Sequence, residues 1–215
     1  MARKSVALAF VLGAITVLGY APFYIYPLPL ITVAAIAILL LRADSTFKAA
    51  LIGFAAGLGL LTAGTSWVYV SLHDYGGMTM PVAAMSSFTF SAIYAVCPAI
   101  AGAIVHRLRM PAALKLLMLF PAAWALADWM RGWLFTGFPW LALGYSQAPA
   151  SPLAGFSPIV GAYGVSLVSA FVAACIALVY LRVAQGGDSG NLSRLERFRS
   201  AAISTPAMLG SAVIL

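Results

Sequence analysis

Residues 49–72 read AALIGFAAGLGLLTAGTSWVYVSL, and this stretch contains no charged side chain. The hydrocarbon core of a bilayer is about 30 Å thick, and roughly 20 apolar residues span it as a helix, since each residue adds 1.5 Å. The stretch meets that requirement. It therefore predicts a transmembrane helix rather than a soluble segment.

Similar apolar segments recur along the chain. Of its 215 residues, 63% are hydrophobic and 8% are charged, whereas soluble domains have about 45–50% apolar and about 25% charged residues. We place membrane spans at 5–20, 28–41, 49–72, 80–105, 113–130 and 157–181, with a seventh that begins near 202 and is cut off at Leu215. The predicted fold is all-α, a polytopic transmembrane helix bundle of about six complete spans plus a truncated seventh.

The positive charges follow these spans in a regular way. The formal net charge is +7, but the basic residues are scattered singly between apolar runs, which argues against a nucleic-acid-binding surface. Most fall in the segments that precede the first span or follow the second, fourth and sixth: Arg3, Lys4, Arg42, Lys48, Arg107, Arg109, Lys115, Arg182, Arg194, Arg197 and Arg199. By the positive-inside rule the N-terminus is predicted to be cytoplasmic.

The seventh span would then run outward, so any segment after Leu215 is expected on the far side of the membrane. A chain that stops inside an apolar run looks truncated. The two cysteines, Cys97 and Cys175, lie within apolar runs without His or acidic neighbours at ligand spacing. We therefore predict no metal site and no cofactor.

Polar and aromatic residues gather on the side opposite the basic segments. One cluster, Ser66–Gly77, contains Trp67, His73, Asp74 and Tyr75. Catalysis by His73 and Asp74 is disfavoured because adjacent residues on a helix point about 100° apart and no nucleophile lies beside them. Interfacial anchoring or contact with phospholipid headgroups is the preferred interpretation.

A second cluster is ADWMRGWLFTGFPWL, residues 127–141. Asp128 and Arg131 are three residues apart, so on one helix they share a face and neutralise each other. Gly137 and Pro139 then end the helix and leave Trp140 on non-helical backbone. We expect an ordered re-entrant or interfacial segment near 131–156, the alternative being a Trp-rich interface belt with a structural ion pair.

Four collinear stretches, one of which overlaps this cluster, resemble the apolipoprotein N-acyltransferases. They are LGYAPFYIYPLPLI, GFAAGLGLLTAGTSWVYVSLHDYGGM, RGWLFTGFPWLALGYSQ and PLAGFSPIVGAYGVS. The resemblance covers about residues 20–175. It implies that residues 1–215 are the N-terminal transmembrane domain of such an enzyme. It also implies a nitrilase-like domain, absent from this chain, with a Glu, Lys and Cys triad that nothing in this chain matches.

The implied reaction transfers an acyl chain from a glycerophospholipid, through an enzyme thioester, to the amine of the diacylglyceryl-cysteine of an apolipoprotein. No catalytic residue is assigned here. The resemblance points to Trp140 of the Phe-Pro-Trp motif, with Gly137, Phe138 and Pro139 shaping its loop. Where relatives can have Glu, this chain has Asp128.

The proposed role of this portion is to hold two lipid-anchored substrates in turn, with headgroups near Arg131, Trp140 and the turn at His73–Gly77. The expected substrate-binding residues are Trp140, Arg131, Asp128, Gly137, Phe138, Pro139, Trp67, His73 and Tyr75. The protein is expected to be a monomer in the bacterial inner membrane and not to bind nucleic acid, and the chain alone is expected to be inactive. Two other classes stay open: a small permease and a non-catalytic membrane scaffold.

Overall fold

A computed structural model describes residues 2–186, and these residues form helices and turns without a β-strand. The main helices are α1 (Ala2–Thr16), α2 (Pro27–Leu41), α3 (Thr46–Gly64), α4 (Ser66–Val70), α5 (Met80–Tyr94), α6 (Val96–Arg107), α7 (Ala112–Leu114), α8 (Phe120–Arg131) and α9 (Ser157–Gly186). Short π-turns, Ser71–Tyr75 and Lys115–Leu119, follow α4 and α7. The predicted all-α class is confirmed.

Four helical segments are long and apolar enough to cross a membrane: Thr46–Gly64, Met80–Arg107, Ala112–Arg131 and Pro152–Ala184. The helices α1 and α2 have 15 residues each, shorter than the usual requirement. The number of six complete spans therefore stays a prediction. The expected seventh span lies outside the described residues.

Close backbone packing holds the centre of the bundle together. A Cβ at Gly53 would collide with the carbonyl oxygen of Pro98, and one at Gly57 would collide with the Pro98 ring. Gly53 and Gly57 therefore both face α6 and let its backbone approach closely, as the small-xxx-small spacing predicts. Because Gly102 of α6 likewise lies against Ala49, the helices α3 and α6 run antiparallel.

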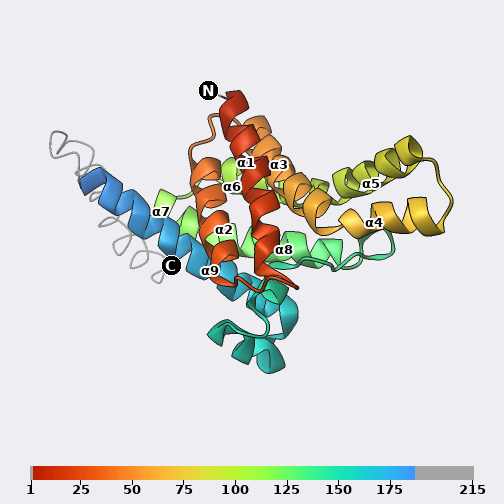
Figure 1. Ribbon diagram of the computed structural model, residues 1–215. Helices are drawn as coiled ribbons and strands as arrows, with labels where there is room; N and C mark the ends of the chain where they lie inside the picture. The colour runs from red at the N-terminus through yellow and green to blue at the C-terminus, as the bar shows by residue number, and fades with distance from the viewer. Residues whose placement is uncertain (1, 187–215) are drawn as a thin grey trace, which may run out of the picture.

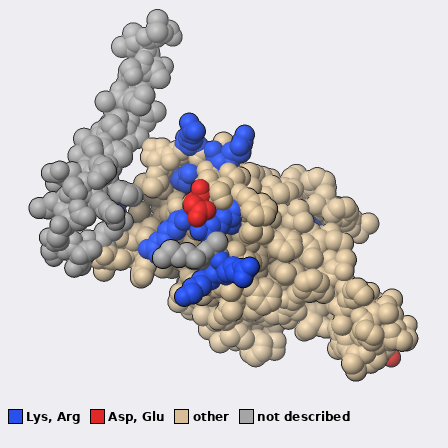
Figure 2. Space-filling model, turned by 90° about the horizontal axis from the view of Figure 1, so that it is seen from above, with Lys and Arg blue, Asp and Glu red and all other residues tan. Residues whose placement is uncertain are grey.

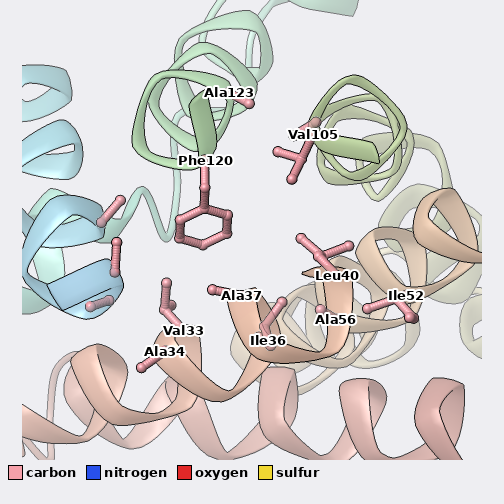
Figure 3. Close-up of a cluster of buried hydrophobic side chains, with 14 of the residues drawn as sticks. Val33, Ala34, Ile36, Ala37, Leu40, Ile52, Ala56, Val105, Phe120 and Ala123 are labelled. Carbon is pink, nitrogen blue, oxygen red and sulfur yellow. The ribbon is translucent and has the colours of Figure 1, made fainter. Parts of the chain in front are cut away.

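A second layer of α2, α8 and α9 completes the core. Figure 3 shows the Phe120 ring of α8 pointing into the space between the helices, toward Val33 and Ala37 of α2. The facing surface of α9 consists largely of alanine, including Ala170, Ala173, Ala174 and Ala177, all fully buried. Small residues there let the large ring fill the centre without separating the helices.

Two of the predicted spans are bent rather than straight. The stretch predicted as one span, 49–72, breaks at Thr65, whose hydroxyl donates to the Leu61 carbonyl at 2.7 Å, a back-bond that favours bending. The span 80–105 breaks at Ala95 because Pro98, four residues after Tyr94, has no N–H to donate to the Tyr94 carbonyl. Between the breaks, α4 and α5 form an arm that projects from the bundle (Figure 1).

Exposed basic side chains gather on the face seen in Figure 2, around an acidic side chain. The N-terminus lies at the end of the molecule that has this face (Figure 1). At the opposite end of α1, the turn that includes Tyr20 and Tyr24 lies near the segment after α8. The bundle therefore has a cationic end and an aromatic end.

Candidate functional site

The segment after α8 is an ordered loop built from three short 3-10 turns: Leu134–Thr136, Leu143–Gln147 and Pro152–Phe156. Phe135, Thr136 and Leu141 have φ angles of 51°, 77° and 59°, which non-glycine residues rarely adopt. At Gly137 the φ angle is 88°, and a Cβ would collide with the Gly132 carbonyl. The Phe138 N–H donates to the Arg131 carbonyl at 2.7 Å, which closes the turn. Gly137 thus occupies a tight turn that a larger residue would disturb.

Asp128 ties this loop to α8. Its Oδ1 accepts a hydrogen bond from Nη2 of Arg131 at 2.9 Å, and its Oδ2 accepts one from the Leu143 N–H at 2.8 Å. Asp128 is 6% exposed and Arg131 is 3% exposed. The predicted ion pair is therefore present, and it is buried beneath the loop rather than open to headgroups.

Side chains from other elements hold the same loop by its backbone. The Tyr20 hydroxyl donates to the Leu141 carbonyl at 2.9 Å, and the Gly144 N–H donates to Oγ of Ser166 at 2.8 Å. The Tyr94 hydroxyl contacts the Phe135 carbonyl at 3.3 Å. Because these partners come from the end of the first helical segment, α5 and α9, the loop has few ways to move as a unit.

Aromatic rings extend from the loop onto the arm. Phe138 packs edge-on against Phe90 of α5, with centroids 4.8 Å apart, and stacks with Trp140 at 5.8 Å. Trp140 in turn lies 6.1 Å from Trp67 of α4. These separations are typical of favourable aromatic pairs. Phe138 therefore anchors the loop, while Trp140 and Trp67, each about half exposed, remain available.

A cavity of about 740 Å³ opens beside these two tryptophans. Its aromatic lining residues are Tyr20, Tyr24, Trp67, Trp140 and Tyr145, and Pro139, Leu141 and Pro149 add apolar surface. No charged residue is among those that line it. A site of this size and character suits an apolar chain better than a phosphate or a carboxylate.

Comparisons with known proteins identify the family of the chain. Residues 12–175 match the family model described as the apolipoprotein N-acyltransferase N-terminal domain. The chain belongs to this family. It is 50% identical over 169 residues to an apolipoprotein N-acyltransferase of Nitrosomonas europaea, an alignment that covers 79% of this chain and 34% of the relative.

Two further N-acyltransferases show the same pattern. The Coxiella burnetii protein is 42% identical over 175 residues, with 80% of this chain and 36% of the relative covered. The Chromobacterium violaceum protein is 38% identical over 167 residues, with 78% and 32% covered. The chain thus spans about a third of the length of these N-acyltransferases.

The structure brings together some of the expected site residues of this N-acyltransferase domain. Trp67, Pro139 and Trp140 line the cavity, and Phe138 supports it from the side. By contrast, His73 and Tyr75 lie on the π-turn that follows α4 and do not line the cavity. Tyr75 is 87% exposed, and Nδ1 of His73 lies 2.8 Å from the Met78 carbonyl oxygen.

Several residues that line the cavity or hold the loop were not among the predicted site residues. Tyr20, Tyr24 and Tyr145 carry a usable signal, because each occurs in a stretch that resembles the N-acyltransferases. Ser166 also ends such a stretch, PLAGFSPIVGAYGVS, but its role could not be predicted, because its hydrogen bond to Gly144 joins positions 22 residues apart.

Proposed function

We propose that this chain forms the membrane domain of an apolipoprotein N-acyltransferase. The enzyme would transfer an acyl chain from a glycerophospholipid to the terminal amine of the diacylglyceryl-cysteine of an apolipoprotein. The observation that supports this most is an uncharged aromatic cavity beside an ordered Phe-Pro-Trp loop in a chain of this family. Residues 1–215 would serve as the transmembrane domain, and a nitrilase-like domain beyond them would provide the Glu, Lys and Cys triad.

In this proposal the cavity receives an acyl chain of the donor or the acceptor. Trp140 and Trp67 form its walls, while Phe138 and Pro139 fix the direction of the loop. Because lipid tails are already in an apolar phase, the hydrophobic effect contributes little to their transfer into the cavity. Selectivity then depends on shape and van der Waals contact with the rigid rings.

Asp128, Arg131 and Gly137 would act indirectly, by holding the loop. A direct contact between Arg131 and a headgroup would require the loop to lift away from α8, since the guanidinium is buried against Asp128. The exposed Tyr75 and the partly buried His73, near the end of the arm, are better placed to meet headgroups. Holding each substrate in one orientation lowers the barrier by making the encounter effectively intramolecular.

The enzyme would act as a monomer in the bacterial inner membrane, with its N-terminus in the cytoplasm. The clustering of basic residues at one end of the bundle supports this orientation, because cytoplasmic segments carry an excess of Lys and Arg (Figure 2). The aromatic end would then face the periplasm. That is the side on which the proposed nitrilase-like domain would meet the cavity.

The test compares two tryptophans of the same loop in the full-length enzyme. Trp140 and Trp133 are 54% and 53% exposed, but only Trp140 lines the cavity. We expect Trp140→Ala to lower kcat/KM for acyl transfer from a labelled phospholipid to a diacylated lipopeptide by about tenfold or more, a loss of about 1.4 kcal/mol in transition-state binding. Trp133→Ala should stay within about twofold of wild type. Equal losses in both variants, or none in Trp140→Ala, would refute the assignment of the cavity.

A further inference from the structure

The cationic end of the bundle contains more exposed positive charge than the rest of the described chain. Five of its basic residues are exposed and have no ion pair within residues 2–186: Arg3, Lys4, Arg42, Arg107 and Arg109. One acidic residue, Asp44, lies in the short segment between α2 and α3, where it pairs with Lys48 at 2.8 Å. Figure 2 shows the resulting excess of positive side chains on this face.

Hydrogen bonds between helix ends fix part of this surface in place. Oγ1 of Thr46, at the start of α3, lies 3.0 Å from Nδ1 of His106, at the end of α6. Nζ of Lys115 donates to the His106 carbonyl at 3.4 Å. Because α3 and α6 run antiparallel, the end of α6 lies beside the start of α3, and Arg107 ends α6 while Arg109 follows it. The cations are therefore presented by joined helix ends rather than by an isolated loop.

Apolar side chains alternate with these cations. Leu108 and Met110, 48% and 37% exposed, alternate with Arg107 and Arg109, and Phe47 beside Lys48 is 73% exposed. Neither a solvated loop nor a nucleic-acid-binding surface requires exposed apolar side chains between its cations. Apolar groups that enter the acyl boundary beside cations at headgroup level are typical of a membrane interface.

We infer that the cationic end of the bundle is a binding surface for anionic phospholipids, with Arg107 and Arg109 contacting lipid phosphates and Leu108, Met110 and Phe47 inserted among the acyl chains. This surface is distinct from the aromatic cavity, which lies at the other end of α1. It would bind lipid as a resident of the leaflet rather than as a donor of acyl chains. Each cation near an anionic surface strengthens attachment, and the attraction weakens with salt.

Lipid binding to the intact purified protein provides the test. Phosphatidylglycerol and phosphatidylcholine with identical acyl chains are titrated separately, and retained lipid is measured by native mass spectrometry at low ionic strength. We expect tighter binding of phosphatidylglycerol, and a loss of about fivefold per cation, or roughly 25-fold, in Arg107→Gln/Arg109→Gln. Equal binding of the two lipids, or unchanged phosphatidylglycerol binding by a folded double variant, would overturn the inference.

A matched pair of aspartate variants keeps the test decisive if the double variant fails to fold. Asp44→Asn and Asp74→Asn change the net charge equally, but Asp44 lies on the cationic end and Asp74 on the arm. Asp44→Asn should tighten phosphatidylglycerol binding by about fivefold and Asp74→Asn should leave it unchanged. Identical behaviour of the two would contradict a localised surface, and displacement by an equal concentration of inorganic phosphate would contradict a lipid ligand. Neither result depends on acyl-transfer activity.

Discussion

Asp128 illustrates what a single buried carboxylate does in this protein. Its spacing from Arg131 predicts their ion pair, since residues three apart share a helix face. The second hydrogen bond, to the Leu143 N–H, joins positions 15 residues apart across a non-helical loop. No periodicity indicates such a contact, because the loop's path depends on positive φ angles and on partners from distant helices.

We expect Asp128→Asn to destabilise the protein strongly. The substitution leaves the Arg131 guanidinium buried without a counter-charge, which typically costs about 3–5 kcal/mol. The apparent melting temperature of the purified protein should fall by roughly 10 °C or more. It is measured as the temperature at which half of the monodisperse protein is lost on heating.

Two further variants separate the buried charge from general damage. In Asp128→Asn/Arg131→Met no unpaired charge remains, so much of the loss should be recovered. Asp44→Asn removes the exposed pair with Lys48 and should leave the melting temperature unchanged, because exposed ion pairs contribute little. A double variant as unstable as the single one would show that the loop contact, and not the charge, dominates.

At the scale of elements, the contact of α3 with α6 depends on the absence of side chains. Gly53→Ala would force the Pro98 backbone away from α3, and we expect a loss of about 1–3 kcal/mol in stability. The thermal assay used for Asp128 measures this effect.

Gly155→Ala is the matched control, because a Cβ at Gly155 meets no atom within 4 Å. It should leave the melting temperature close to that of wild type. If the two alanine variants behaved alike, the close approach of the two helices would not be what stabilises this pair.

The helix boundaries also show how far sequence patterns extend. Apolar length identifies α2 (Pro27–Leu41) within one residue of the prediction, because hydropathy determines where a helix is buried. It cannot detect the break at Thr65, since a bent helix and a straight one have the same composition. The break at Ala95 has a visible cause in Pro98, but prolines are tolerated within membrane helices and do not reveal the direction of the bend.

At the scale of the whole molecule, the orientation in the membrane can be tested with another pair of aspartates. Asp44→Cys and Asp74→Cys, in a background in which Cys97 and Cys175 are replaced by alanine, place one thiol on the cationic end and one on the arm. With the N-terminus in the cytoplasm, a membrane-impermeant maleimide added to intact cells should label Asp74→Cys. It should label Asp44→Cys only after permeabilisation. The reverse pattern would invert the proposed topology.

The overall class of the protein could be predicted because it depends on local features, namely uncharged length and basic flanks, and the Gly, Pro and Trp-rich segment indicated where the helix after Phe120 would end. The cavity itself could not be predicted. Its walls come from Tyr20, Trp67 and Trp140, which are distant in sequence and meet only through tertiary packing. Local patterns do not encode how one helix end approaches another.

The hydrogen bonds that hold the Trp140 loop also bear on the order in which the protein folds. The bond from Tyr20 to Leu141 and the one from Gln147 to Tyr26 each join positions 121 residues apart. Contacts of such separation form late, because the intervening chain must first lose its conformational freedom. While the N-terminal helices emerge and insert, the cavity has no wall on the loop side. The cavity is therefore complete only at one of the last steps of assembly, so a partly synthesised chain has no enclosed site there in which a ligand could be held.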